Sequence, residues 1–302
     1  MNLSVKVAGI SIKGRRSENQ DRIFFASRVR GSRISAVVSL ADGMGGTQGG
    51  AIASEETIKE FEAILQKGFS VDREQIQNWF RQFLNATIRR MRNFAEKDPS
   101  LQSMGTTFVA SILLQDGSLI TVNIGDSRSY VITPERIHQI TSDHTLIGEA
   151  LLSGKEVASD LQSMRDYLTK ALTPYSTDEP DVFYHNVNAF NEDGVVVIVC
   201  SDGLYKVVDN EAVLSTIASC ATLEEALKSL TRQAEVNGSS DNISIAAMEV
   251  GKFKRTPVSA KNDITVSLDT KTKKMKTGRI LLWLICALAV GSLLFFLRVW
   301  QN

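Results

Sequence analysis

The chain has 302 residues, enough for one domain of about 250 residues and shorter appended segments. Its 34 Lys and Arg residues balance 34 Asp and Glu residues, which excludes the overall basic excess typical of nucleic-acid-binding proteins. The three cysteines, Cys200, Cys220 and Cys286, are widely spaced and fit neither a disulfide framework nor a thiolate metal site, so we expect reduced thiols.

Three strands and two long helices are predicted for the N-terminal part of the chain. Alternating apolar residues indicate the strands, and apolar residues at helical spacing indicate the helices. The predicted ranges are 5–12, 23–25 and 34–40 for the strands, and 51–65 and 72–96 for the helices. Pro99 ends the second helix, whose aromatic stripe fits core packing better than a binding face.

Strands dominate the pattern from Gly105 onwards. We predict an antiparallel meander of four strands joined by Gly- and Asp-containing turns, at 106–114, 118–124, 129–132 and 137–140. The polar, weakly helical stretch 145–167 that follows predicts a small inserted flap, assigned to about 145–170. A strand pair, two helices and a last strand complete the domain, at 181–187, 195–200, 208–218, 223–237 and 243–250.

The C-terminal part has a different composition. Residues 251–279 carry few large apolar side chains and many Lys, Thr and Ser, which predicts a flexible basic linker. Residues 280–297 contain no charge over 18 positions, about 27 Å as a helix, and predict one membrane span followed by the short tail 298–302. A buried soluble helix is the alternative, but such a helix normally shows a polar face.

The charges that flank the predicted span indicate its orientation. Four lysines and Arg279 lie between residues 271 and 279, whereas Arg298 alone follows the span, so we expect the N-terminal side to be cytoplasmic. Residues 1–10 lack the charged and apolar pattern of a secretory signal. The prediction is a single-pass, C-terminally anchored membrane protein with a cytoplasmic catalytic domain.

Four aspartates share one sequence context, because each lies at the end of an apolar run: Asp42, Asp126, Asp202 and Asp241. Side chains at the strand ends of packed sheets can converge on one edge. Convergent carboxylates repel one another, and oxygen-preferring cations such as Mg²⁺ or Mn²⁺ stabilise their clustering. The sequence contains no cluster of Cys or His residues of the kind that binds zinc, so zinc is disfavoured. Two such ions about 4 Å apart would activate a bridging water and hold a phosphoryl group.

Asp42 lies in the glycine-dense stretch 40–50, where backbone groups can approach an ion closely. Taken singly, an Asp-Gly pair after a strand is most often only a turn, and an Asp-Asn pair before a strand is often only a cap. The interpretation of the aspartates therefore depends on the residues around them.

Seven short motifs occur in order within residues 5–250. They are Glu18-Asn19-Gln20-Asp21, Ala41-Asp42-Gly43-Met44-Gly45-Gly46, Gly105-Thr106-Thr107, Gly125-Asp126-Ser127-Arg128, Ser142-Asp143-His144, Ser201-Asp202-Gly203-Leu204 and Ser240-Asp241-Asn242-Ile243. In this order they resemble the metal-dependent type 2C Ser/Thr protein phosphatase family, and the set is far more specific than any one motif.

The resemblance implies a metal centre with Mn²⁺ or Mg²⁺, two ions with a third at a weaker site. Asp42 would bridge the two ions, and the Gly43 carbonyl would bind one of them. Asp202 and Asp241 would complete the protein ligands of the other ion, and Asp126 would help to hold the third.

Two further roles follow from the same resemblance. Asp21 would accept a hydrogen bond from a metal-bound water, and Arg16 would clamp the substrate phosphate with its planar guanidinium. Arg15 is the rival for this clamp, and a solvated surface charge is the alternative interpretation of Arg16.

This sequence departs from the family pattern at two positions. Gln20 replaces a glutamate found in many relatives, which should weaken metal affinity. Met44 replaces the histidine proposed as general acid in eukaryotic members, and a thioether cannot donate a proton, so the resemblance is to the bacterial members. His144 is one candidate for a substitute acid, although Ser-Asp-His also fits a structural turn.

The predicted fold is α+β: a four-layer α-β-β-α sandwich of two antiparallel sheets flanked by helices over residues 1–250, plus the C-terminal transmembrane helix. The implied activity is hydrolysis of phosphoserine and phosphothreonine on proteins by a metal-bridging hydroxide. We expect a monomeric catalytic domain with phosphoprotein substrates and no nucleic-acid partner. Two alternatives stay open: a non-catalytic phosphoprotein-binding scaffold of the same fold, and a phosphatase that acts on small phosphoesters.

Overall fold

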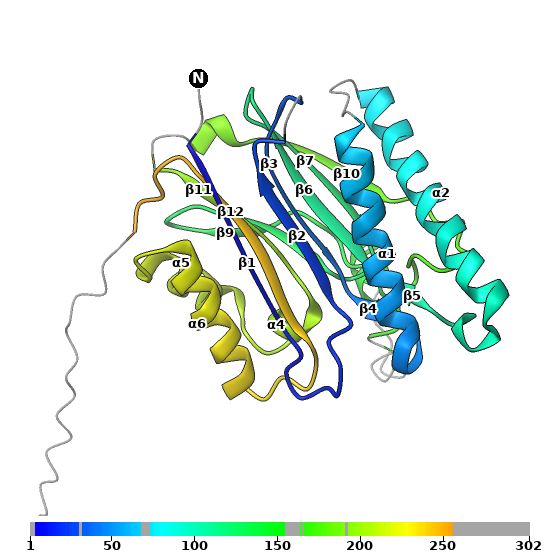
Figure 1. Ribbon diagram of the computed structural model, residues 1–302. Helices are drawn as coiled ribbons and strands as arrows, with labels where there is room; N and C mark the ends of the chain where they lie inside the picture. The colour runs from blue at the N-terminus through cyan, green and yellow to red at the C-terminus, as the bar shows by residue number, and fades with distance from the viewer. Residues whose placement is uncertain are drawn as a thin grey trace, which may run out of the picture. The chain divides into compact units, whose positions relative to one another are not determined.

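Two five-stranded antiparallel sheets form the centre of the protein, shown in a computed structural model (Figure 1). The structure describes residues 4–29, 32–67, 73–154, 164, 166–190 and 193–255. The chain divides into two units, residues 1–258 and 259–302, and every described residue belongs to the first.

Each sheet combines strands from distant parts of the sequence. The first sheet contains, in spatial order, β1 (Val5–Ile12), β12 (Ile243–Val250), β11 (Val195–Cys200), β8 (Arg128–Ile132) and β9 (Ile137–Gln139). The second contains β10 (Asp181–Asn186), β7 (Ser118–Ile124), β6 (Phe108–Leu114), β3 (Ile34–Ala41) and β2 (Arg22–Ser27). A separate two-stranded ladder joins β4 (Gly43–Met44) to β5 (Gly105–Thr106).

Helices cover the outer face of each sheet (Figure 1). The second sheet packs against α1 (Gly46–Gln66) and α2 (Arg73–Lys97), and the first packs against α5 (Asn210–Ser219) and α6 (Leu223–Val236). The shorter helices are α3 (Leu146–Leu152), α4 (Asp202–Tyr205) and the 3₁₀ turns η1 (Pro99–Leu101) and η3 (Val187–Phe190). The predicted end of α2 at Pro99 is confirmed, since Asp98 caps the 3₁₀ turn that follows.

Three apolar clusters fill the spaces between these layers. One joins α1 and α2 to the second sheet, one lies between the two sheets, and one joins α5 and α6 to the first sheet. Successive strand residues point to opposite faces, so Val37 of β3 enters the helix-facing cluster and Val38 enters the cluster between the sheets. The predicted α+β sandwich of antiparallel sheets and flanking helices is confirmed.

The predicted four-stranded meander is wrong, because its strands belong to two sheets. Strands β6 and β7 pair within the second sheet, whereas β8 and β9 pair within the first. The chain changes sheet at Gly125, whose φ of 107° is open to glycine and strained for other residues. The predicted pair 181–187 and 195–200 is also divided, since β10 pairs with β7 and β11 lies between β8 and β12.

Helix α1 begins at Gly46, five residues before the predicted start at Ala51. Gly45 precedes it with a left-handed φ of 107°, and a side chain there would meet the carbonyl of Ser103. The glycines after Asp42 therefore serve a sharp turn directly into the helix.

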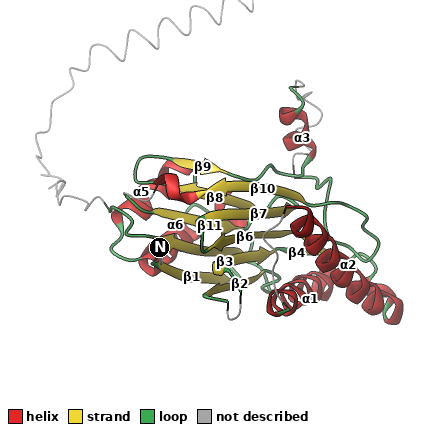
Figure 2. Ribbon diagram, turned by 90° about the horizontal axis from the view of Figure 1, so that it is seen from above, coloured by secondary structure: helices red, strands yellow, loops and turns green. Residues whose placement is uncertain are grey.

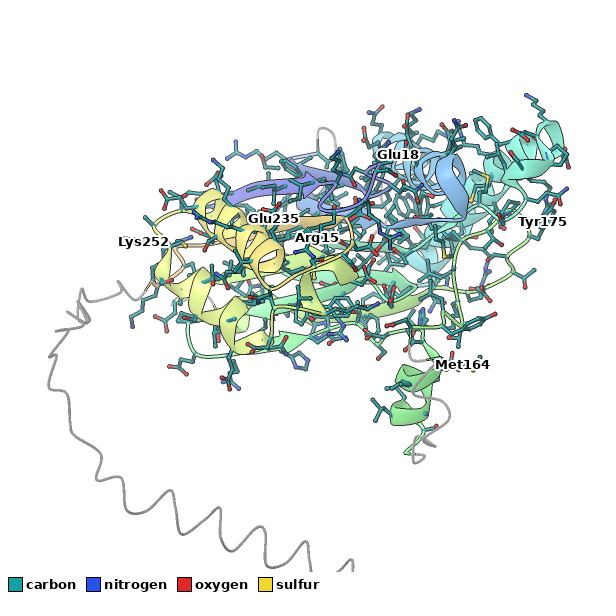
Figure 3. All side chains as sticks on the ribbon, turned by 90° about the horizontal axis from the view of Figure 1, so that it is seen from below. Arg15, Glu18, Met164, Tyr175, Glu235 and Lys252 are labelled. Carbon is teal, nitrogen blue, oxygen red and sulfur yellow. The ribbon has the colours of Figure 1, made fainter. Side chains whose placement is uncertain are left out.

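The predicted flap contains α3, which projects from the sandwich in Figure 2. Thr145 caps this helix, and Leu151 and Leu152 are each 67% exposed. Figure 3 shows Met164 beside α3, also away from the sheets. The flap is held at its base by hydrogen bonds from Leu146 N to the Tyr167 carbonyl (3.2 Å) and from Thr169 N to the His144 carbonyl (2.9 Å).

No helix among the described residues is long and apolar enough to cross a membrane. The predicted span 280–297, the tail 298–302 and all of the predicted linker beyond residue 255 lie outside the described residues.

The aromatic cluster around Phe61 yields a stability prediction. The ring centroid of Phe61 lies 5.0 Å from that of Phe108 and 5.5 Å from that of Phe83, and its side chain is fully buried. Phe61→Ala should lower the free energy of unfolding by about 3–5 kcal/mol in urea denaturation, because the cavity removes these contacts. Phe94→Ala is the control, since Phe94 is 38% exposed on α2. A loss below about 1 kcal/mol for Phe61→Ala would contradict the packing.

Candidate functional site

One cleft of about 520 Å³ receives the four predicted aspartates, and it lies at the edge where the strand ends meet. Asp42 follows β3, Asp202 follows β11 and begins α4, and Asp241 lies two residues before the start of β12. Asp126 follows β7 at the crossing between the sheets and lines the same cleft. The structure thus brings these residues together, while their roles as ligands remain predictions.

The concentration of carboxylates perturbs their protonation. Burial raises the pKa of Asp42 well above its usual range, and the nearby charges of Asp21, Asp202, Asp126 and Asp241 raise it further. Burial also raises the pKa of Asp21 to about 6 and, together with Asp202, that of Asp126 to about 6. The cluster is therefore unfavourable at neutral pH unless positive charge is supplied.

Two basic side chains supply part of that charge. Arg16 Nη2 donates to Asp241 Oδ2 at 2.7 Å, and Lys206 Nζ donates to Asp202 Oδ2 at 2.7 Å. Arg16 lines the cleft and its hydrogen bond to Asp241 raises its pKa, so it stays charged. Arg15 is not among the residues that line the cleft, which favours Arg16 as the phosphate clamp.

The backbone around Asp42 is fixed by two threonines. Asp42 N donates to Thr107 Oγ1 at 3.0 Å, while the Asp42 carbonyl accepts from Thr107 N at 2.9 Å and from Thr106 Oγ1 at 2.8 Å. A side chain at Gly43 would collide with the carbonyl of Gly50. Only glycine fits this approach, which leaves the Gly43 backbone bare at the cleft wall.

Asn242 fastens the loop that carries Arg16. Its Nδ2 donates to the carbonyls of Lys13 and Glu18, each at 2.9 Å, and its Oδ1 accepts from Gln20 N at 2.8 Å. Arg16 therefore lies in a loop held on both sides to the residue next to Asp241.

The donor set fits a hard divalent cation. Asp21 Oδ2 and Asp202 Oδ1 are buried and have no hydrogen-bond partner in the structure, an arrangement that is rare without an ion or water. Carboxylate and carbonyl oxygens are the ligands that Mg²⁺ and Mn²⁺ prefer. In the described part of the chain no group of three or more His, Cys, Asp and Glu side chains is gathered closely enough to hold an ion, and Asp241 and Asp202 are paired with Arg16 and Lys206 instead.

Asp126 is held by an aromatic side chain. Tyr205 OH donates to Asp126 Oδ2 at 3.1 Å, and the Arg128 guanidinium lies 3.6 Å from the centroid of the Tyr205 ring. Arg128 in turn forms a forked ion pair with Asp143, with a shortest distance of 2.6 Å. This network fixes one oxygen of Asp126, the predicted ligand of the third ion.

The structure shows where three other residues discussed from the sequence, His144, Gln20 and Met44, lie relative to the cleft. His144 Nδ1 accepts from Gly125 N at 3.0 Å and Nε2 lies 3.2 Å from Asp181 Oδ2, so this buried histidine stabilises the turn before Asp126 and does not line the cleft. Gln20 Nε2 donates to the Gly46 carbonyl at 2.9 Å. Met44 lines the cleft, where its thioether carries no proton to donate.

Residues 8–238 match the family model described as protein phosphatase 2C. The chain belongs to the protein phosphatase 2C family. Among its relatives, the serine/threonine phosphatase stp of Listeria monocytogenes is 31% identical over 216 residues, which cover 70% of this chain and 84% of that protein. Protein phosphatase PhpP of Streptococcus pneumoniae is 27% identical over 241 residues, covering 79% of this chain and 94% of PhpP.

Solved structures of serine/threonine phosphatases share the fold of this chain, and one of them contains manganese. The S. agalactiae serine/threonine phosphatase aligns with a TM-score of 0.71 and 27% identity over 81% of this chain and 99% of its own. The catalytic domain of PstP, solved in complex with two manganese ions, aligns with a TM-score of 0.68 and 26% identity over 83% of this chain and 100% of its own. Protein phosphatases 2C use Mn²⁺ or Mg²⁺.

Sequence reasoning missed several residues of this phosphatase site. Asn242 and Thr107 stood in two of the quoted motifs without a role, because only their contacts show what they hold. Lys206 and Tyr205 were overlooked, although Lys206 lies four residues after Asp202 and this spacing places the two side chains on one helix face.

Asn242 provides a test of the loop that carries Arg16. Asn242→Ala should lower the free energy of unfolding by about 1–3 kcal/mol and raise KM for a phosphopeptide, because three backbone groups lose their partner and Arg16 loses its position. Asn237→Ala is the control. It removes one hydrogen bond of the same kind, from Asn237 Nδ2 to the Val207 carbonyl outside the cleft, and should leave KM unchanged. Equal KM values for both variants would contradict the role of Asn242.

The perturbed carboxyls predict a pH-dependent effect of metal. The pKa values of Asp21 and Asp126, about 6, exceed the ordinary 3.8, so the folded chain binds more protons than the unfolded chain between about pH 4 and pH 6. These groups therefore lower stability as pH rises through that window. Since bound cations displace the protons, Mn²⁺ should raise Tm more at about pH 7.5 than at about pH 5. Scanning calorimetry with and without chelator measures this difference, and a larger rise at the lower pH would contradict it.

Proposed function

We propose that this protein phosphatase 2C removes phosphate from phosphoserine and phosphothreonine on cytoplasmic proteins, or on cytoplasmic parts of membrane proteins, close to a membrane. The chain is a metal-dependent protein serine/threonine phosphatase. The observation that carries the proposed mechanism is the meeting of Asp42, Asp202 and Asp241 with Arg16 in one cleft.

The chain's own residues divide the work between ion binding and substrate binding. Asp42, Asp202, Asp241 and the Gly43 carbonyl would hold two divalent cations, with Asp126 at a weaker third. When bound, the ions supply positive charge for the phosphoryl oxygens and an activated water for attack at phosphorus.

The Arg16 guanidinium is suited to bind the phosphate of the substrate. Its planar fork matches two phosphoryl oxygens, and it remains charged at every physiological pH. In the structure it donates to Asp241, so substrate binding exchanges part of this contact for the phosphate. Asp21, buried beside Asp42, is proposed to orient a water through its unpartnered Oδ2.

Protonation of the leaving oxygen differs from relatives with a histidine at position 44. Met44 has no proton to give, and His144 accepts a hydrogen bond from Gly125 N and lies near Asp181, away from the cleft. We therefore assign this proton to solvent water in the cleft.

Substitution of the central carboxylates tests the mechanism. Asp42→Asn and Asp202→Asn should each lower kcat/KM for a phosphothreonine peptide in Mn²⁺ by about 10²-fold or more, because each removes an anionic ligand. Excess chelator should abolish turnover of the native enzyme.

Asp209→Asn is the matched control, since this carboxylate caps α5 outside the cleft and asparagine is an equally good cap. Metal-independent turnover, or full activity of Asp42→Asn, would overturn the mechanism. The peptide should also be a better substrate than small sugar phosphates; the reverse preference would favour the small-phosphoester alternative, and no turnover of either would favour the scaffold.

The membrane part of the proposal is supported by the sequence alone. The uncharged stretch 280–297 has the length of a membrane span, and the basic residues before it favour a cytoplasmic N-terminal side. A tethered enzyme would act on phosphoproteins within reach of the linker.

Removal of the predicted span tests the tether. The full chain should remain with membranes after an alkaline carbonate wash, whereas a variant lacking residues 280–302 should be released and keep its peptide phosphatase activity. Release of the full chain by the wash would exclude a spanning anchor, because peripheral proteins dissociate under these conditions.

A further inference from the structure

Lys206 links the metal cleft to the flap through two carboxylates. It follows α4 and lies four residues after Asp202, and its Nζ is 2.7 Å from Asp202 Oδ2 and 2.9 Å from Asp166 Oδ1. All three side chains line the cleft. Burial lowers the pKa of Lys206, but the two carboxylates raise it by more, so the amine is charged.

The two carboxylates differ in their surroundings. The Asp202 side chain is 17% exposed, and its other oxygen, Oδ1, is buried without a hydrogen-bond partner. The Asp166 side chain is 60% exposed. Lys206 therefore places a positive charge beside Asp202, a predicted metal ligand, and also contacts the exposed carboxylate of Asp166.

Asp166 belongs to the base of the flap. The neighbouring Tyr167 carbonyl accepts from Leu146 N, the first residue of α3, and Leu168 pairs with Thr145, which caps α3. A change in the contact between Lys206 and Asp166 therefore acts on the segment from which α3 projects.

We propose that Lys206 is a positioning residue that competes with the divalent cation for Asp202 and, through Asp166, couples metal binding to the flap. Without metal, the ammonium neutralises Asp202 and ties Asp166 to the cleft. With metal bound, Asp202 would be a ligand of the doubly charged ion. The ion would repel the ammonium of Lys206 and so weaken the contact between Lys206 and Asp166. This inference rests on the metal centre of the proposed function.

The strengths of the contacts suit such a coupling. An ion pair as exposed as that of Lys206 with Asp166 contributes little, so a change in nearby charge is enough to break it. By linkage, if metal binding weakens the contact between Lys206 and Asp166, that contact in turn weakens metal binding. Removing the ammonium should therefore strengthen metal binding and loosen the flap.

Lys206→Met tests both effects, because methionine keeps the length of the side chain and removes its charge. The full chain, purified in detergent and freed of metal, is titrated with Mn²⁺ by calorimetry. We expect Lys206→Met to bind Mn²⁺ at least threefold more tightly than the native chain. Lys254→Met is the control, since Lys254 pairs with the exposed Asp193 outside the cleft, and it should bind Mn²⁺ like the native chain.

Hydrogen exchange of the described flap base, residues 166–170, is the second measurement. In the native chain Mn²⁺ should speed this exchange by up to about fivefold, the factor that loss of an exposed ion pair allows. In Lys206→Met and in Asp166→Asn the exchange should already be fast without Mn²⁺ and should not change when it is added. A merely structural role of Lys206 would leave the response to Mn²⁺ intact.

Two results would overturn this inference alone. The first is that Lys206→Met binds Mn²⁺ no more tightly than the native chain. The second is that Mn²⁺ does not change the hydrogen-exchange rate of the flap base in the native chain. Circular dichroism establishes that each variant is folded, and Lys206→Gln replaces Lys206→Met if the latter is not. Failure of the native chain to bind Mn²⁺ at all would instead overturn the metal centre of the proposed function, and this inference with it.

Discussion

Repulsion among carboxylates at one edge of the sandwich is the constraint on which the rest of the structure depends. Asp42 lies beside the buried Asp21 and faces the charges of Asp126, Asp202 and Asp241. Such a cluster persists only where cations balance it and where the backbone cannot move apart. Arg16 and Lys206 each balance one carboxylate at the rim, and the buried oxygens that remain without a partner are left for a divalent ion.

The sandwich supplies the rigidity that this edge requires. Strands β3, β7, β11 and β12, whose ends carry the aspartates, are buried along nearly their whole length between layers of apolar side chains. A strand packed on both faces cannot shift its end without disturbing two cores. The local supports, Thr107 behind Asp42 and Asn242 beside Asp241, then fix the last few backbone bonds. Stability from the apolar core thus holds an unfavourable charge cluster in the geometry that function needs.

The sequence predicted the parts of this design that depend on local pattern. The apolar runs located the buried strands, and the motifs located the aspartates, because each of these signals is contained within a short stretch of the sequence. The assignment of strands to sheets was not predictable in the same way. A turn such as Gly125-Asp126 looks the same in a hairpin and in a crossing between sheets, and only the pairing of Arg128 with Cys200 decides between them. The roles of Asn242 and Lys206 also depend on contacts with distant segments, which no local pattern records.

The two basic side chains at the cleft, Arg16 and Lys206, are held differently. One side of the site is therefore fixed and the other can change its arrangement. Arg16 lies in a loop that Asn242 fastens at Lys13, Glu18 and Gln20, so the proposed phosphate-binding side would be organised before substrate arrives. Lys206 faces an exposed carboxylate on the projecting flap, where little free energy is needed to change the arrangement. The phosphate is common to every substrate and the surrounding protein is not. In the proposed function, the firmly held loop of Arg16 would bind the group common to all substrates, and the weakly held flap would adjust to the protein around it.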